Sequence, residues 1–164
     1  MVVRLGSVIL FIMLNTLEAA SVLSHSLIFH GIDLPALENL AECGKLVRFE
    51  SKSVIVQEND SKNRALNVIV EGSVQILKSG SAKVTQLGRG NFFGEISLFS
   101  MGTAATATVT APQGATIFSV GRLELEKWFK RFSNAEILFF RHLSTELCHR
   151  LNATTEKLGA SLES

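Results

Sequence analysis

The middle of the chain, from about Val47 to Val120, is a succession of short β-branched segments, and this feature constrains the fold most strongly. Residues such as Gly, Asn, Asp and Ser separate the segments, as expected for strands joined by turns. The five predicted strands are SVIVQE, LNVIVEGSVQIL, AKVTQLG, TATVTAP and ATIFSVG. Five or more short strands at this spacing are typical of a barrel or a sandwich, so the sequence predicts a mainly β domain.

Helical patterns flank this predicted barrel on both sides. Residues 21–46 have apolar residues at helical spacing, and Pro35 follows Asp33 where a helix is expected to start. Beyond the strands, the helical period returns in RLELEKWFKRF and then in a longer segment, residues 134–160. We therefore expect the order helix, β-barrel, helix and long helix.

The last helical segment has the spacing of a helix that packs against another helix. Residues at steps of four and three along it are Phe140, Ser144, Leu147, Leu151, Thr154 and Leu158. An apolar stripe of this kind is unfavourable in water, so we predict a parallel homodimer through this helix. The predicted dimer-interface residues are Phe140, Leu147, Leu151 and Leu158.

Composition limits the size and the partners of the protein. The chain has 164 residues, of which 46% are hydrophobic and 19% are charged, enough for one globular domain with a real core. We assign this domain to residues 21–164. Lys and Arg number 16 against 15 for Asp and Glu, so no strong overall field attracts nucleic acid or an anionic membrane. Nucleic-acid binding and a membrane span are therefore not expected.

The first 20 residues, MVVRLGSVILFIMLNTLEAA, permit two interpretations. A basic Arg4, an apolar run over residues 8–14 and small residues at Ala19 and Ala20 resemble a signal peptide, and the run is too short to span a bilayer. The same residues also fit an amphipathic helix packed on its own domain, which is the interpretation that we prefer.

The two cysteines indicate a reducing compartment. Cys43 and Cys148 are far apart in the sequence and form no Cys-x-x-Cys pair, whereas a secreted domain held by disulfides normally has more. We expect both thiols to be reduced and to lie in the core or at an interface, in a cytoplasmic protein.

Residues 90–111, GNFFGEISLFSMGTAATATVTA, have the composition of a loop that wraps an anion, but they contain no basic residue. A tight turn at Gly94 would let the backbone approach a phosphate. A short helix after this turn would present free N–H groups from residues such as Ile96 and Ser97. The sequence therefore predicts a phosphate-binding loop without a charge partner.

Two stretches, FESKSVIVQENDSKNRALNVIVEGSVQIL and LGRGNFFGEISLF, together resemble the cyclic nucleotide-binding domain family, in particular its bacterial catabolite-activator branch. The resemblance covers about residues 21–159, and its most specific part is residues 93–98, FGEISL, which match the family's phosphate-binding cassette. It implies a double-stranded β-helix (jelly-roll) barrel with N-terminal helices and a long C-terminal dimerisation helix. The ligand-binding residues that it implies are Phe93, Gly94, Glu95, Ile96, Ser97, Ala105, Thr106, Thr154 and Thr155.

The resemblance also suggests roles for three of these residues. Glu95 would accept a hydrogen bond from a ribose 2′-hydroxyl, or alternatively it is a buried carboxylate that caps the short helix. Thr154 and Thr155, in RLNATTEKLG, match two hydroxyl residues on the dimer helix that contact adenine, one from each subunit. The alternative for both threonines is an ordinary position on the helix surface or a polar position within the row of residues that packs against the other helix.

One residue departs from the family pattern. Ala105 stands where the family places the arginine that pairs with the cyclic phosphate, and Thr106 falls on the adjoining hydroxyl position. Removing one partner of a buried charge pair costs about 2–5 kcal/mol of binding free energy. Arg64 and Arg89 are the basic residues that we consider as substitutes, and we expect both to be solvated loop residues. Cyclic nucleotide binding should therefore be weak.

Catalytic patterns are missing from the sequence. The four histidines, His25, His30, His142 and His149, lie in predicted helical segments outside the barrel, where they cannot form the metal site of a β-helix enzyme. No nucleophile-elbow, Walker-type or His-Glu-x-x-His motif is found. We expect no enzyme activity, no catalytic residue, no metal and no cofactor. Because the sequence ends soon after the long helix, we also expect no DNA-reading helix-turn-helix.

Two hypotheses for function remain. In the first, the domain is a non-catalytic ligand sensor that binds cAMP or cGMP weakly, or another small anionic ligand, and signals through its C-terminal helix to a partner protein. In the second, the fold no longer binds nucleotide and acts as a dimerising or scaffolding domain.

Overall fold

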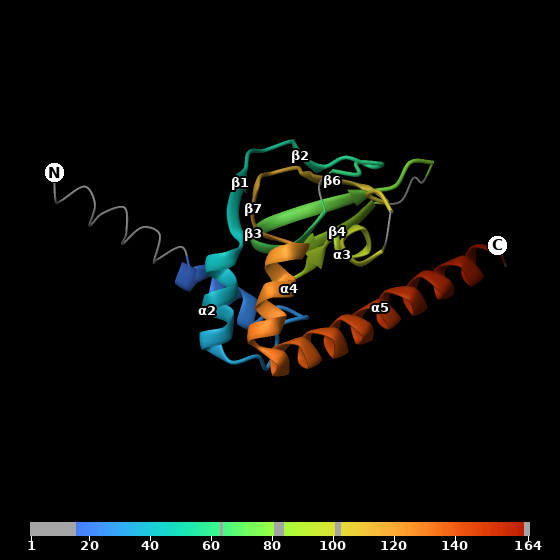
Figure 1. Ribbon diagram of the computed structural model, residues 1–164. Coiled ribbons are helices and arrows are strands. Elements are labelled where there is room, and N and C mark those ends of the chain that lie inside the picture. The colour runs from blue at the N-terminus through green and yellow to red at the C-terminus, as the bar shows by residue number, and fades with distance from the viewer. Residues whose placement is uncertain (1–15, 63, 81–83, 101–102, 163–164) are drawn as a thin grey trace.

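The computed structural model describes residues 16–62, 64–80, 84–100 and 103–162 of the chain (Figure 1). Residues 16–24 are helical. The elements that follow are α2 (Leu34–Cys43), β1 (Lys45–Phe49), β2 (Ser53–Val56), β3 (Ala65–Leu77), β4 (Val84–Gly88), β5 (Phe92–Phe93), α3 (Glu95–Phe99), β6 (Thr108–Ala111), β7 (Ala115–Gly121), α4 (Arg122–Arg131) and α5 (Ser133–Leu162). The predicted order of helix, β-barrel, helix and long helix is confirmed.

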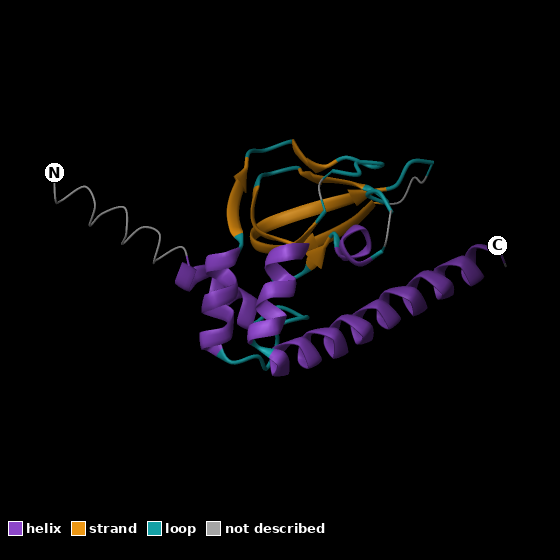
Figure 2. Cartoon of the chain, viewed as in Figure 1, coloured by secondary structure: helices purple, strands orange, loops and turns teal. Residues whose placement is uncertain are grey.

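The strands form a mainly antiparallel sheet of the jelly-roll type, as predicted. Its order is β1-β7-β3-β6-β2, and β4 and β5 also pair with β3. β3 has 13 residues and pairs with β4, β5, β6 and β7, so it connects all parts of the sheet. Figure 2 shows the strands on one side of the molecule and the helices α2, α4 and α5 on the other. The sequence analysis missed β1, which begins inside the segment expected to be helical, and the short β5.

Gly72 lies inside β3 and adopts a φ of 80°, in the left-handed region. The register of β3 against β7 shifts between Ile69 and Glu71, which is the signature of a bulge. A Cβ at position 72 would lie 2.6 Å from the carbonyl oxygen of Gly114, so glycine is required here by close approach of two backbones.

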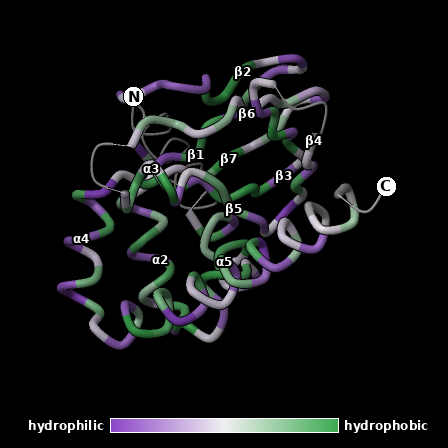
Figure 3. Tube along the Cα trace, turned by 90° about the vertical axis from the view of Figure 1, so that its right-hand side faces the viewer, coloured by the Kyte–Doolittle hydropathy of each residue, from purple (hydrophilic) through white to green (hydrophobic). Residues whose placement is uncertain are grey.

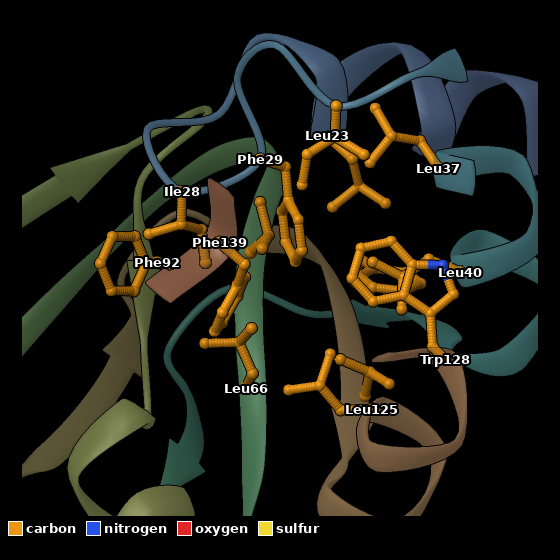
Figure 4. Close-up of a cluster of buried hydrophobic side chains, with 14 of the residues drawn as sticks. Leu23, Ile28, Phe29, Leu37, Leu40, Leu66, Phe92, Leu125, Trp128 and Phe139 are labelled. Carbon is orange, nitrogen blue, oxygen red and sulfur yellow. The ribbon is translucent and has the colours of Figure 1, made fainter. Parts of the chain in front are cut away.

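The larger hydrophobic core lies between the sheet and the helices. Figure 4 shows Leu66 of β3 and Leu40 of α2 close to Trp128 of α4 and Phe139 of α5. The Trp128 indole Nε1 donates a hydrogen bond of 2.8 Å to the carbonyl oxygen of Ala36, so its polar atom is satisfied in the core. A second core inside the barrel contains Ile69, Val74, Phe93, Val109 and Ile117. The larger core holds α2, α4 and the start of α5 against the sheet.

The first described residues pack on the domain. Ala19, Ala20 and Leu23 are buried in the larger core, so residues 16–24 form part of the fold. The remainder of the proposed N-terminal helix, including Arg4 and residues 8–14, lies outside the described residues. None of the described helices has both the length and the apolar character needed to cross a membrane.

Cys43 and Cys148 are free thiols, as expected, but both are exposed. A core position is therefore wrong for both cysteines, and the alternative, a position at an interface, stays a prediction. Cys43 is the last residue of α2, and Cys148 lies on α5 beside the exposed Leu147.

α5 presents two different faces. Phe139 and Leu143 bury one face against the domain. The other face, which we call the seam, is solvent-exposed at heptad spacing and consists of Ile137, Phe140, Ser144, Leu147, Leu151 and Thr154. Leu151 is 66% exposed. Figure 3 shows hydrophobic and hydrophilic residues interleaved along α5, and the side chain of the predicted interface residue Leu158 lies outside what the structure describes.

Candidate functional site

A cavity of about 220 Å³ opens between the sheet, α3 and α5. Its lining comprises Val56, Ala65, Asn67, Ile76, Phe93, Gly94, Glu95, Ile96, Ser97, Ala105, Thr106, Ala107, Val109 and Arg150. Seven of the nine predicted ligand-binding residues are thus brought together at one site, namely Phe93, Gly94, Glu95, Ile96, Ser97, Ala105 and Thr106. Thr154 and Thr155 are not among the lining residues.

Gly94 forms the turn that shapes one wall of the cavity. It precedes α3 with a φ of 90°, a conformation that other residues rarely adopt. A Cβ at this position would overlap the carbonyl oxygen of Ala65 and lie 2.9 Å from Nδ2 of Asn67. The backbone of the turn therefore packs directly against β3, and no side chain fits between them.

The polar side chains near this turn make hydrogen bonds within the protein. The Ser97 hydroxyl donates to the carbonyl oxygen of Gly94 at 3.1 Å, and Asn67 Nδ2 donates to the carbonyl oxygen of Ala65 at 3.0 Å. Both bonds are local, and they hold the cavity wall in shape. Two donors at the site are therefore already in use.

Arg150 is a cavity residue that the sequence analysis missed. It extends from α5, where Nη1 donates to Oε1 of Glu95 at 3.2 Å and Nη2 donates to the carbonyl oxygen of Phe92 at 3.1 Å. Nε donates to Oε1 of Glu146 at 3.0 Å, and the guanidinium lies 4.3 Å from the centroid of the Phe92 ring. Charge-assisted bonds of this kind are stronger than neutral ones, so α5 is fastened to the cassette through one side chain.

A sequence signal for Arg150 did exist. It precedes Thr154 by four residues, and residues four apart lie on the same helix face. A threonine expected at a binding site thus places Arg150 one turn earlier on that face. The resemblance directed attention to the missing arginine at Ala105 rather than to an arginine 55 residues beyond Glu95 in sequence.

Glu95 is the buried acid of the site, with 6% of its surface exposed. Burial raises the pKa of Glu95 above its usual value because the charged form loses solvation, and the Arg150 guanidinium partly offsets that rise. The carboxylate faces Arg150, and hydrogen bonding to the backbone N–H of Glu95, in the first turn of α3, also lowers the pKa. Ribose binding and helix capping therefore both stay predictions for Glu95.

Another wall of the cavity is lined by Ala105 and Thr106, and the described residues place no basic side chain in it. The backbone of Ala105 exchanges hydrogen bonds with Asn59 and Asp60. Arg64 and Arg89 are not lining residues. Arg89 is exposed as expected, but Nε of Arg64 is buried without a hydrogen-bond partner, so the expectation of a solvated Arg64 is wrong. Within the part of the chain that the structure describes, Arg150 is the only cationic side chain in the lining.

An ion pair fixes this wall from outside the cavity. The Glu58 carboxylate accepts a 2.6 Å hydrogen bond from Nζ of Lys78, and Nζ also donates to the carbonyl oxygen of Thr106 at 2.7 Å. The Ser79 backbone N–H donates to the second Glu58 oxygen. These bonds, led by the one from Lys78, lower the pKa of Glu58 to about 2.

This lowered pKa predicts a specific acid sensitivity. Glu58 stabilises the fold above its ordinary pKa of 4.5, and this stabilisation is lost as the pH falls toward 2. In Glu58→Gln, the loss of unfolding free energy relative to wild type should therefore be largest near pH 7 and should vanish near pH 2. Urea unfolding at several pH values measures this difference. Glu50→Gln, an exposed site before β2, is the control, and a constant difference for Glu58→Gln across this range would contradict the prediction.

Thr154 and Thr155 face solvent on α5. Their hydroxyls donate to the carbonyl oxygens of Arg150 and Leu151 at 2.8 and 3.0 Å. These bonds are internal to the helix. The role of the two threonines in base recognition therefore stays a prediction.

Comparison with known proteins identifies the type of domain. The family model described as the cyclic nucleotide-binding domain matches residues 46–132, which is more than half of the chain. The chain belongs to the cyclic nucleotide-binding domain family. The match includes β1 to β7, α3 and α4, and thus every lining residue of the cavity except Arg150.

Curated relatives of this family member are transcriptional regulators. It is 32% identical over 130 residues to the cAMP-activated global transcriptional regulator CRP of Salmonella typhimurium, and this alignment covers 76% of the chain and 59% of the relative. The CRP of Pasteurella multocida is 29% identical over 129 residues, with the same coverage. The chain thus spans about three fifths of the length of these relatives.

Solved structures agree on the fold. The catabolite activator protein of Thermus thermophilus superposes with a TM-score of 0.69 at 21% identity, covering 82% of this chain and 62% of that one. A cyclic nucleotide-binding domain from Methylobacillus flagellatus superposes with a TM-score of 0.74 at 15% identity, covering 88% and 83%. At these identities, the likeness supports the jelly-roll domain with its C-terminal helix.

Proposed function

We propose that this family member is a non-catalytic regulatory module that senses a small ligand in the cavity and signals through α5. The observation that carries the proposal is the position of Arg150. It belongs to α5, yet it lines the cavity and donates hydrogen bonds to both Glu95 and the carbonyl oxygen of Phe92. Anything that binds at Glu95 therefore acts directly on a contact that positions α5.

The physical basis is a difference in ligand contacts between two positions of α5. A ligand that binds Glu95 competes with Arg150 or adds a bridge to it, so it favours one position of the helix over the other. The larger core holds the start of α5 through Phe139 and Leu143. Beyond these residues, Arg150 makes the described contacts with the cassette, so the second half of α5 is the part that can respond.

In this mechanism, the signal is the position of the seam on α5. Ile137, Leu147 and Leu151 are exposed at heptad spacing, which suits a second copy of the same helix in a parallel pair. A change at Arg150 alters the position of the seam because both belong to α5. The proposed readout is therefore the geometry of a homodimer, sensed by a partner protein.

The second hypothesis, a scaffolding domain without a ligand, draws on one observation. Among the residues that the structure describes, no cation lines the cavity wall formed by Ala105 and Thr106. Calorimetric titration of the intact protein with millimolar cyclic AMP and cyclic GMP separates the two functions, and it should include the corresponding uncharged nucleosides. Measurable saturation by any of them favours the sensor, whereas none favours the scaffold.

The variant Arg150→Ala tests the link between the cavity and α5. It leaves the buried Glu95 without its cation, so we expect it to lower the free energy of unfolding by about 1–3 kcal/mol. Amide hydrogen exchange in the second half of α5 should also become faster. Arg141→Ala, at an exposed arginine of the same helix, is the control. Unchanged exchange in α5 of Arg150→Ala would show that Arg150 does not position the helix.

A further inference from the structure

We infer that the cavity takes an uncharged ligand that joins a flat apolar ring to hydroxyl groups, a nucleoside in preference to a cyclic nucleotide. The inference rests on the proposed function, because it requires that the cavity bind a small ligand. It goes beyond that function by naming the class of ligand, and it replaces the anion expected from the sequence.

The first argument is the charge balance of the cavity. The described lining contains two charged side chains, Glu95 and Arg150, which have opposite signs and lie 3.2 Å apart. Their charges cancel, so no net positive charge remains to receive an anion. An anion that enters must share the single positive charge of Arg150 with the Glu95 carboxylate, so the site would carry an uncompensated negative charge.

The second argument is which hydrogen bonds remain available. Three of the five N–H groups of Arg150 already donate to Glu95, Glu146 and the carbonyl oxygen of Phe92. Ser97 and Asn67 donate to backbone carbonyls. Thr106 adds a neutral hydroxyl to the described lining, and the charged acceptor there is the Glu95 carboxylate, which only accepts hydrogen bonds when ionised. A phosphate oxygen also only accepts, whereas a hydroxyl can donate, so a hydroxyl group complements Glu95 and a phosphate does not.

The third argument is the apolar part of the lining. Val56, Ile76, Phe93 and Val109 contribute aliphatic and aromatic surface, and Ala105 and Ala107 add small apolar side chains. Such walls favour a flat ring over a charged group. The volume of about 220 Å³ is below the roughly 300 Å³ at which pockets for drug-sized ligands begin, so the occupant must be small.

Two pairs of probes test the inference on the intact wild-type protein by calorimetry. Adenosine is compared with cyclic AMP, and guanosine with cyclic GMP, so each pair shares its base and sugar and differs in the phosphate. We expect at least one nucleoside to bind at least tenfold more tightly than its cyclic nucleotide. Tighter binding of both cyclic nucleotides would overturn the inference and leave the proposed sensor intact. Absence of binding by all four at millimolar concentration would overturn both and favour the scaffold.

The variants Ala105→Arg and Ala105→Gln test the physical cause. Arginine supplies the missing positive charge, so it should tighten cyclic nucleotide binding at least tenfold and thereby reduce the preference for the nucleoside, and added salt should reduce the gain. Glutamine has a long side chain without charge and should preserve the preference for the nucleoside. Equal gains in cyclic nucleotide binding for both variants would show that charge does not set the preference. Circular dichroism checks that each variant is folded, and if the arginine variant is not, the wild-type and glutamine comparisons still decide the inference.

Discussion

Replacing Gly94 with alanine is expected to lower the free energy of unfolding by about 2–5 kcal/mol and to abolish ligand binding in the cavity. The φ of 90° at this residue strains any L side chain by about 1–2 kcal/mol. The new Cβ would also overlap the carbonyl oxygen of Ala65, which belongs to β3 and cannot move freely. Overpacking of this kind lowers the free energy of unfolding by a further amount of about 1–3 kcal/mol.

Urea unfolding measures this effect, and Gly88→Ala is the matched control. Gly88 ends β4, and a Cβ at this position would meet no atom within 4 Å. Its replacement should change the free energy of unfolding by less than about 1 kcal/mol. Equal losses in the two variants would show that the tight turn before α3 is not a special requirement of the fold.

The double variant Leu147→Glu, Leu151→Glu is expected to be monomeric at micromolar protein concentration, where the wild type is expected to be a dimer. Both leucines are exposed on the seam in a single chain, 37% and 66% respectively. In a parallel pair, each would face its counterpart, so four carboxylates would be placed in the apolar centre of the interface. Light scattering with size-exclusion chromatography measures the mass.

The control for this variant is Thr145→Glu, Asn152→Glu. Both residues are exposed on α5, and each lies one position beyond a seam residue, away from the helix pair. This variant adds the same charge to the same helix, so it should remain dimeric. A dimer that survives in the leucine variant would exclude the seam as the interface.

The fold could be predicted from sequence because its signals are local. β-branched runs bounded by Gly, Asn and Asp give the main strands, and a change from a period of two to one of 3.6 marks α4 and α5. The prediction failed where contacts distant in sequence decide the conformation. β1 at Lys45–Phe49 is held by β7, and Gly72 is required by the approach of Gly114, some 40 residues later.

The candidate site also divides into residues that a local motif predicts and a residue whose role depends on a contact distant in sequence. Residues 93–97 lie within one short motif, and the structure places all of them in the cavity lining. Arg150 is 55 residues from Glu95 and has no motif of its own, so its contact depends on how α5 crosses the domain. The balance of charge in the cavity follows from that crossing. This charge balance could not be deduced from Ala105 alone, because the missing arginine indicated only weaker binding of a cyclic nucleotide.

The pairing of β3 also has a consequence for synthesis of the protein. β3 is made early, but its partners β6 and β7 begin at Thr108 and Ala115, more than 30 residues after Leu77. At about 5–20 residues per second, the ribosome needs a few seconds to supply them. During this interval the nascent chain leaves unpaired the edge of β3 that later pairs with β7, in a segment that contains Leu66, Val68 and Val70. The element that unites the finished sheet is thus the segment that most needs protection from aggregation before the sheet is complete.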